Sequence, residues 1–117
     1  MNILVVDDTP IVRDTIKSLL EQSGHNVELA ENGMRALILI EKENKRFDLI
    51  ITDYSMTVLN GIGVIFRVRS IVPDARIWLV SALLHDHIAK KALELGAEKA
   101  INKGELSQAL KEAGIIA

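Results

Sequence analysis

Short apolar runs that stop abruptly at polar residues are the feature of this sequence that most constrains its fold. Residues 3–6, 49–51 and 77–80 are apolar at every position and rich in β-branched side chains. A continuous run of this kind is typical of a strand buried on both faces, and such strands belong to parallel sheets. Two shorter candidates, residues 27–30 and 99–102, would complete a sheet of five strands.

Segments of helical length and spacing separate these runs. Pro10 suits the first turn of a helix that ends before Gly24. The apolar run 36–40 could pass for a strand, but Asn32-Gly33 before it and residues 41–46 after it favour a helix. Three further helices are expected over residues 62–69, 88–95 and 106–113, the second with Gly96 as its C-terminal cap.

The strict alternation of strands and helices predicts an α/β domain with a parallel sheet, right-handed crossovers and helices on both faces. The length of 117 residues is close to the commonest size of one domain, and no repeat or linker interrupts the series. We therefore expect a single domain over residues 1–117. In open sheets of this class, ligands bind beyond the carboxyl ends of the strands.

The residues expected at those strand ends are Asp7, Asp8, Asp53, Ser81 and Lys103. Three carboxylates at one edge repel one another, and a hard divalent cation resolves the conflict. Mg²⁺ prefers oxygen ligands, so Asp7 and Asp8 are predicted to hold magnesium. Asp53 directly follows an apolar run and is the best-positioned nucleophile for an aspartyl phosphate. Lys103 and Ser81 offer an ammonium and a hydroxyl to the charge that phosphoryl transfer develops.

These positions belong to a longer pattern. It comprises Asp7-Asp8 after the first strand, Asp53-Tyr54-Ser55-Met56 after the third, Asn60-Gly61 at the third helix, Ser81-Ala82 after the fourth strand and Lys103 after the fifth. In this order and at this spacing, the chain resembles response regulator receiver domains over essentially its whole length. The resemblance implies a flavodoxin-like, doubly wound sheet of five parallel strands in the order 2-1-3-4-5.

Roles for individual residues follow from the resemblance. Asp53 would be the phosphoacceptor and one of the metal ligands, Asp8 a direct metal ligand and Asp7 a ligand acting directly or through water. The backbone carbonyl of Ser55 would also bind the metal, which is Mg²⁺ with Mn²⁺ as a substitute. The implied donors are phosphohistidine on a histidine kinase or a phosphotransfer protein, and small acyl phosphates. The chain would catalyse its own phosphorylation and dephosphorylation and would signal in trans to a protein partner that the sequence does not specify.

Three positions depart from the family pattern. Thr57 and Gly104 stand where most members have proline, and Ala100 stands where many have an aromatic ring that moves on activation. A cis bond before a non-proline residue costs about 3 to 4 kcal/mol, so we expect the Lys103–Gly104 bond to be trans. Without a ring at Ala100, we expect output through backbone and helix shifts near residues 81–87 or through another surface.

Simpler roles exist for each residue taken alone. Aspartates are common in turns at strand ends, Ser81 could cap the next helix, and Lys103 could be a solvated lysine. The departures motivate a second function, that of a pseudo-receiver that binds partners without switching by phosphorylation. A nucleotide- or flavin-binding protein on a similar sheet would need a glycine-rich loop after the first strand, where this chain has Asp7-Asp8-Thr9-Pro10.

Charge and composition argue against other classes. With 14 basic and 16 acidic residues, the chain lacks the positive charge that direct nucleic-acid binding needs. The first apolar run is too short for a signal peptide or a membrane span, and the absence of cysteine is compatible with the expected cytoplasmic location. Trp78 is expected in the core, and His85 and His87 on the surface. Leu83-Leu84 and Ile115-Ile116 are apolar near expected loops or the terminus, which suggests a partner surface there.

Overall fold

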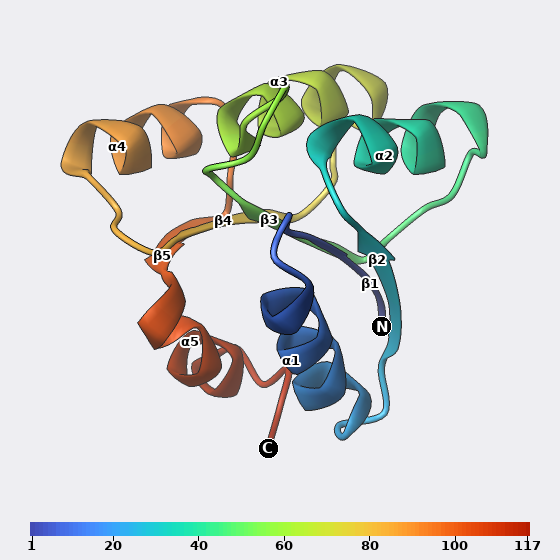
Figure 1. Cartoon of the computed structure of the whole chain (residues 1–117), viewed down its shortest axis with the longest axis vertical. Helices are drawn as coiled ribbons and strands as arrows, with labels where there is room; N and C mark the ends of the chain where they lie inside the picture. The colour runs from blue at the N-terminus through green and yellow to red at the C-terminus, as the bar shows by residue number, and fades with distance from the viewer.

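The computed structural model describes all 117 residues and contains one parallel sheet in the order β2-β1-β3-β4-β5 (Figure 1). The strands are β1 (Asn2–Val6), β2 (Asn26–Ala30), β3 (Leu49–Asp53), β4 (Ile77–Ser81) and β5 (Lys99–Asn102). The helices are α1 (Pro10–Glu21), α2 (Gly33–Leu37), α3 (Gly61–Ile71), α4 (Asp86–Glu94) and α5 (Leu106–Glu112). A π-helical turn, η1 (Ile38–Lys42), extends α2, and a 3₁₀ turn, η2 (Lys103–Glu105), precedes α5. The predicted α/β fold and strand order are confirmed.

Helices cover both faces of the sheet. Figure 1 shows α2, α3 and α4 on one face and α1 and α5 on the other. Side chains of β1 alternate between the two layers. Leu4 and Val6 join the core beneath α2, α3 and α4, whereas Ile3 and Val5 join the core beneath α1 and α5. This double burial explains why the strand is apolar at every position.

Two strands are longer than their apolar runs. β3 includes Thr52 and Asp53, and β4 includes Ser81, so these polar residues end strands instead of opening the turns that follow. Pairing with the neighbouring strand holds each of them, because Asp53 lies opposite Val80 and Ser81 lies opposite Asn102. The ladder therefore fixes the backbone that carries Asp53 and Ser81 at the carboxyl edge of the sheet.

Local signals at the helix ends agree with the predicted limits. Asn60 caps α3, and its side chain accepts a hydrogen bond from the N–H of Gly63 at 3.0 Å. Gly96 follows α4 at φ +102°, the left-handed conformation in which glycine commonly ends helices. The apolar run 36–40 is helical, as predicted, and is shared between α2 and η1. None of the helices combines the length and the apolar character that crossing a bilayer requires.

The exposure of individual side chains tests several of the sequence-based predictions. Ile115-Ile116 is buried in the core beneath α1 and α5, at 6% and 7% exposure, so the prediction of a partner surface there is wrong. Leu83, by contrast, is 71% exposed. Trp78 is fully buried, as predicted. His85 and His87 are exposed, also as predicted, and their rings stack with centroids 5.8 Å apart.

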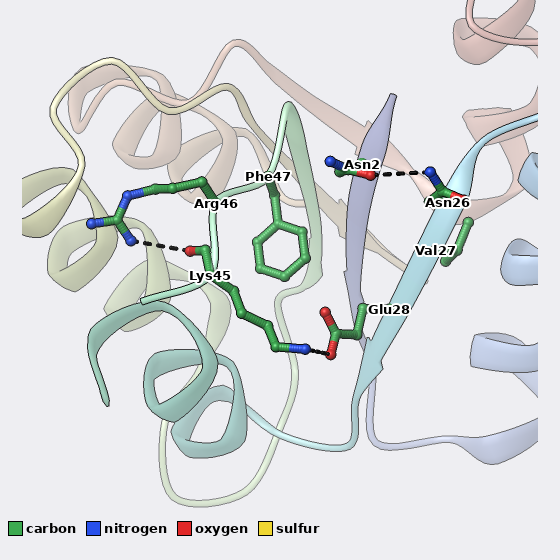
Figure 2. A pocket seen from close by; sticks show the side chains of 7 residues that line it. All are labelled: Asn2, Asn26, Val27, Glu28, Lys45, Arg46 and Phe47. Atoms are coloured by element: carbon green, nitrogen blue, oxygen red, sulfur yellow. Dashed lines mark hydrogen bonds and ion pairs between the residues drawn. The ribbon is translucent and has the colours of Figure 1, made fainter. Parts of the chain in front are cut away.

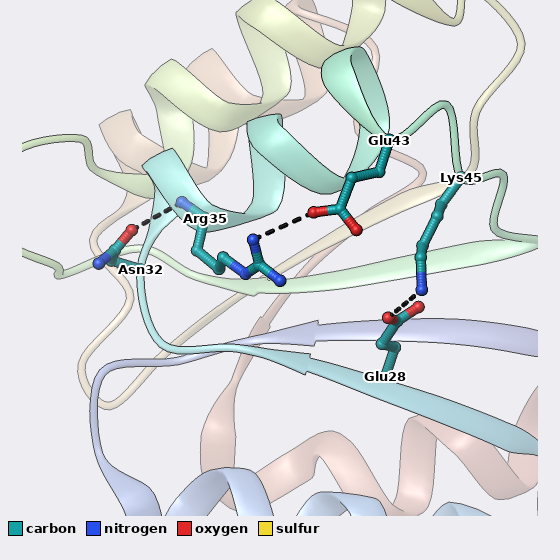
Figure 3. Close-up of polar contacts among 5 residues, drawn as sticks. All are labelled: Glu28, Asn32, Arg35, Glu43 and Lys45. Carbon is teal, nitrogen blue, oxygen red and sulfur yellow. Dashed lines mark hydrogen bonds and ion pairs between the residues drawn. The ribbon is translucent and has the colours of Figure 1, made fainter.

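Charged pairs lie at the edge strand β2 and on the helical segment beside it. Lys45 Nζ lies 2.5 Å from Glu28 Oε1, and Arg35 Nη1 lies 3.1 Å from Glu43 Oε2 (Figure 3). Charges at an edge strand disfavour pairing with another chain. Beside Lys45 is a hollow of about 380 Å³, lined by Asn2, Asn26, Val27, Glu28, Lys45, Arg46 and Phe47 (Figure 2). It borders the amino ends of β1 and β2 and is therefore distinct from the carboxyl edge.

Candidate functional site

Three carboxylates meet at the carboxyl edge of the sheet. Asp7 and Asp8 follow β1, and Asp53 is the last residue of β3. One oxygen of each carboxylate lies within 4.8 Å of an oxygen of the other two. Their proximity follows from the topology, because β1 and β3 are paired neighbours. Asp7 and Asp53 are 1% and 4% exposed, whereas Asp8 faces solvent.

Lys103 reaches the same place from the residue that follows β5. Its Nζ atom lies 2.8 Å from Asp7 Oδ2 and 3.2 Å from Asp53 Oδ1. The lysine side chain is only 23% exposed, so both ion pairs are largely shielded from water. The alternative of a solvated lysine is wrong for Lys103. The ammonium of Lys103 thus contacts Asp53, the carboxylate that the sequence predicts to be the nucleophile.

Burial and repulsion leave the cluster short of positive charge. Burial, and after it the charge of Asp7, raises the pKa of Asp53 above its ordinary value of 3.8, although Lys103 opposes the shift. Burial alone would lower the pKa of Lys103. The hydrogen bond to Asp7 and the charges of Asp53 and Asp7 outweigh that effect, so the pKa of Lys103 is raised. One ammonium therefore does not satisfy three carboxylates.

The donor set fits a magnesium ion. Carboxylate oxygens are ligands that Mg²⁺ takes readily, and three are within joint reach here. Asp7 Oδ2 is fully buried, and the ammonium of Lys103, 2.8 Å away, is its one close partner. Asp8 leaves one side of the cluster open to solvent, which suits an ion that keeps several of its waters.

Ser81 and Ser55 lie on the two segments that leave the sheet beside Asp53. Ser81 ends β4 and is 5% exposed, whereas Ser55 is exposed in the loop between β3 and α3. The N–H of Tyr54 donates to Val80 O at 2.8 Å and joins the two segments. Ser81 does not cap α4, because His85 holds that position. The roles of the Ser81 hydroxyl and the Ser55 carbonyl stay predictions.

A glycine lets the loop after Asp53 close. The N–H of Gly61 donates to Tyr54 O at 2.8 Å. A Cβ atom at Gly61 would lie 2.5 Å from Asp53 O and 2.9 Å from Tyr54 Cα, and it would also strike Leu79 Cδ1. Because no real Cβ packs that closely, only glycine lets α3 begin directly against the strand that carries Asp53.

The family departures have clear positions. The Lys103–Gly104 bond is trans, as predicted. Ala100 is half-buried on β5 and packs against the core beneath α2, α3 and α4. Thr57 lies in the β3–α3 loop, where its carbonyl accepts the N–H of Leu59 at 2.8 Å. The tight turn centres on Val58, a β-branched residue at φ +70°, which is a strained conformation.

Two groups that orient Asp7 were missed at the sequence level. Arg13 on α1 donates from Nη1 to the backbone carbonyl of Asp7 at 2.8 Å. The N–H of Thr9 donates to Asp7 Oδ1 at 2.9 Å. Thr9 could have been found, since an aspartate at a strand end often accepts from the N–H two residues later. Nothing in the sequence shows that the Arg13 side chain turns back toward β1.

The chain is similar to known proteins over nearly its whole length. Residues 3–114 match the sequence model of the response regulator receiver domain. A gliding motility regulatory protein of Myxococcus xanthus is 36% identical over 108 residues, which cover 91% of this chain and 14% of that protein. The solved structure of the Vibrio cholerae chemotaxis protein CheY4 has a TM-score of 0.86 at 26% identity and covers 99% of this chain and 98% of that one.

A second solved structure bears on the site. A response regulator from Burkholderia pseudomallei, described with a phosphorylated aspartic acid, a calcium ion and citrate, has a TM-score of 0.86 at 28% identity. The match covers 96% of this chain and 65% of that one. The chain spans 14% to 44% of the length of the first curated relatives that it matches. Those proteins therefore contain large regions with no counterpart here.

Proposed function

We propose, from the premise that this chain belongs to the response regulator receiver domain family, that it accepts a phosphoryl group on Asp53 and signals to a protein partner. The donor is a phosphohistidine on a histidine kinase or a phosphotransfer protein of a two-component system. The observation that carries the proposal is the meeting of three carboxylates with Lys103 at one edge of the sheet. That charge pattern matches what phosphoryl transfer to a carboxylate requires.

Four groups would hold the cofactor. Asp7, Asp8 and Asp53 offer carboxylates and Ser55 its backbone carbonyl to Mg²⁺, which Mn²⁺ could replace. When bound, the ion neutralises carboxylate charge and stabilises the charge on the oxygens of the transferred group. The burial of Asp7 and Asp53 supports this assignment, because buried carboxylates that repel one another gain most from a cation.

Asp53 acts as the nucleophile in this proposal. A carboxylate oxygen attacks phosphorus, and a P–O bond forms while the P–N bond to the donor histidine breaks. The electron pair of the broken bond stays on the imidazole nitrogen, which takes up a proton from solvent. Attack by water on the aspartyl phosphate later releases inorganic phosphate and regenerates the carboxylate. The chain catalyses both steps on itself.

Lys103 and Ser81 stabilise the transferred group. Before transfer, Lys103 Nζ lies 3.2 Å from Asp53 Oδ1, so the ammonium can follow negative charge onto a phosphoryl oxygen with a small movement. The Ser81 hydroxyl, at the end of the adjacent strand β4, donates to a second phosphoryl oxygen. Donors that are in position before the reaction need little reorganisation, which lowers the barrier.

Incubation with acetyl phosphate and Mg²⁺, followed by intact-mass measurement, tests the proposal. Wild type should gain the mass of one phosphoryl group, and Asp53→Asn should gain none. Asp14→Asn is the matched control, because it removes an exposed carboxylate of α1 and should label like wild type. EDTA should abolish labelling. An unlabelled wild type, under conditions that label a known receiver domain, would support the pseudo-receiver suggested by Ala100 and Gly104.

The wider assignment rests on the same premise. We propose that residues 1–117 act as one receiver domain, in the cytoplasm, with proteins as partners on both the input and output sides. The formal charge of −2 gives no support to direct contact with nucleic acid. A pull-down with phosphorylated and unphosphorylated protein, using Asp53→Asn as the control, would identify the partners that depend on phosphorylation.

A further inference from the structure

The side chain of Asn102 crosses from β5 to the loop between β4 and α4. Its Oδ1 atom accepts the backbone N–H of Leu84 at 2.9 Å, and the contact is partly buried. Asn102 is the last residue of β5, and Leu84 lies two residues before α4. The hydrogen bond therefore ties the end of a strand to a segment that leads directly into a helix.

The side chain of Asn102 does not cap the helical turn that follows it. Asparagine before a helical turn commonly caps that turn with its own side chain. Asn102 stands at the N-cap position of η2, but it makes no side-chain cap there. Its amide oxygen accepts the N–H of Leu84 in the β4–α4 loop instead, so the side chain holds the loop and not its own helical turn.

The β4–α4 loop has little else to hold its backbone. Among the N–H groups of residues 82–85, that of Leu84 is the one that a protein atom accepts. The next bonded amides, those of Ile88 and Ala89, belong to α4 and bond back to His85 O. Because Leu84 has the one accepted N–H in this stretch, a displacement of Asn102 would reach the loop backbone at that residue.

Asn102 also adjoins two groups of the proposed reaction. Ser81 is its partner in the β4–β5 ladder. Lys103 is the next residue in the chain, and its ammonium pairs with Asp7 and Asp53. A displacement of Lys103 toward a phosphoryl oxygen would therefore act on a backbone whose neighbouring side chain holds the loop in front of α4.

We propose that Asn102 is a positioning residue that couples the state of Asp53 to the β4–α4 loop and the first turn of α4. The inference rests on the proposed function, since it needs a charge change at Asp53. Ala100 offers no ring for this purpose, whereas the Asn102 amide spans the distance from the lysine segment to the loop. Phosphorylation moves Lys103, the Asn102 side chain follows, and Leu84 carries the shift toward His85 and α4.

Amide exchange and NMR shifts test the coupling without measuring activity. The probe is Mg²⁺ with beryllofluoride, a non-covalent mimic of the phosphoryl group, added to the full 117-residue chain. In wild type, the Leu84 amide should exchange more slowly than those of Ala82 and Leu83, and the probe should shift amides around Asp53 and over residues 84–89. Asn102→Leu, which keeps the size but lacks the acceptor, should speed Leu84 exchange about fivefold or more.

The same variant should separate binding from transmission. Asn102→Leu should still show the shifts around Asp53, with an apparent probe affinity within about fivefold of wild type, but should lose those at residues 86–89. Asn102→Asp retains an acceptor oxygen and should restore them. Asn26→Leu is the matched control, because Asn26 is exposed at the amino end of β2, and it should behave like wild type.

The outcomes distinguish the two proposals. If the probe shifts no amide around Asp53 in wild type, the proposed function fails. If it does, but Asn102→Leu transmits the change to residues 86–89 as wild type does, the role of Asn102 is refuted. If Asn102→Leu does not fold, the wild-type exchange rates still decide, because an unprotected Leu84 amide would refute the hydrogen bond on which the coupling depends.

Discussion

Lys103 Nζ lies 3.2 Å from Asp53 Oδ1, and this ion pair joins the last residue of β3 to the first residue after β5. The ammonium and a bound Mg²⁺ would neutralise the same group of carboxylates. Before phosphoryl transfer, the ammonium therefore weakens Mg²⁺ binding by neutralising the same carboxylates. During transfer, both cations stabilise the negative charge on the phosphoryl oxygens. Removing the ammonium should thus change metal binding and phosphorylation in opposite directions.

Lys103→Met should bind Mg²⁺ more tightly than wild type, because Asp7 and Asp53 then lack their only protein cation. It should nevertheless accept the phosphoryl group from acetyl phosphate about 10² to 10³ times more slowly, the usual loss when one positioned donor is removed. Metal titration followed by Trp78 fluorescence and intact-mass time courses measure the two effects. Lys111→Met, which removes an exposed lysine of α5, is the control. A parallel loss of metal affinity and rate would contradict the competition.

Asp53→Asn should stabilise the metal-free protein at neutral pH. Burial and the charge of Asp7 raise the pKa of Asp53 above its ordinary value of 3.8. Between the ordinary pKa and the raised pKa, the folded chain therefore binds more protons than the unfolded chain. The free energy of unfolding of wild type then falls as the pH rises through this range, and the asparagine variant escapes that loss. Urea unfolding without Mg²⁺ should show a higher midpoint for Asp53→Asn than for wild type.

The pH dependence supplies the control for this stabilisation. Below the ordinary pKa of 3.8, the carboxyl is neutral in both the folded and the unfolded chain, so the advantage of the variant should disappear. Asp14→Asn, at an exposed site, should follow wild type at every pH. If Asp53→Asn were no more stable than wild type at neutral pH, Lys103 would have to compensate fully for burial and repulsion.

Binding of Mg²⁺ should raise the free energy of unfolding of wild type, and Asp8 should be one of the ligands that this effect requires. A ligand that binds only the folded chain adds about 2.7 kcal/mol when it is present at a hundred times its dissociation constant. Asp8 is the exposed member of the cluster, so Asp8→Asn removes a ligand without leaving a buried polar group unpaired. Differential scanning fluorimetry across a Mg²⁺ series should give an upward shift for wild type and for Asp14→Asn, and a much smaller one for Asp8→Asn.

Much of the fold was predictable because burial on both faces leaves a distinct signal in sequence. The alternation of Ile3 and Leu4 between two cores requires an apolar residue at every position of β1. Strand limits were less visible, since Asp53 and Ser81 are polar and yet belong to strands through backbone pairing. The apolar pair Ile115-Ile116 led to the wrong prediction of a partner surface, because the chain after α5 packs back onto the core.

The meeting of Asp7, Asp53 and Lys103 was predictable for a different reason. Parallel strands bring all their carboxyl ends to one edge, so topology alone gathers the residues there. The contacts of Arg13 and Asn102 were not predictable, because a long or rotatable side chain can reach several partners and only the packed structure selects one. Local pattern thus identifies which residues share an edge, and tertiary packing decides which atoms they touch.

Val58→Asn should stabilise the loop that carries Ser55. Val58 has φ +70°, and the left-handed region costs a residue with a Cβ atom about 1 to 2 kcal/mol. Asparagine tolerates that region better, and Val58 is 90% exposed, so little packing is lost. Thermal unfolding should show a gain of about 1 kcal/mol. The neighbouring Thr57→Asn has no positive φ to relieve and should change stability little.

Gly61→Ala should cost about 1 to 3 kcal/mol of stability, the range found when a methyl group is forced into a packed site. The new Cβ would lie 2.5 Å from Asp53 O and would strike Leu79, so α3 must move away from β3. Because the new Cβ also presses on the backbone carbonyl of Asp53, phosphorylation by acetyl phosphate should slow as well. Gly104→Ala is the matched control, since nothing lies within 4 Å of its Cβ position and its φ is not positive. An unchanged unfolding midpoint for Gly61→Ala would mean that the loop between β3 and α3 yields freely, and Gly61 would then have no part in holding Asp53.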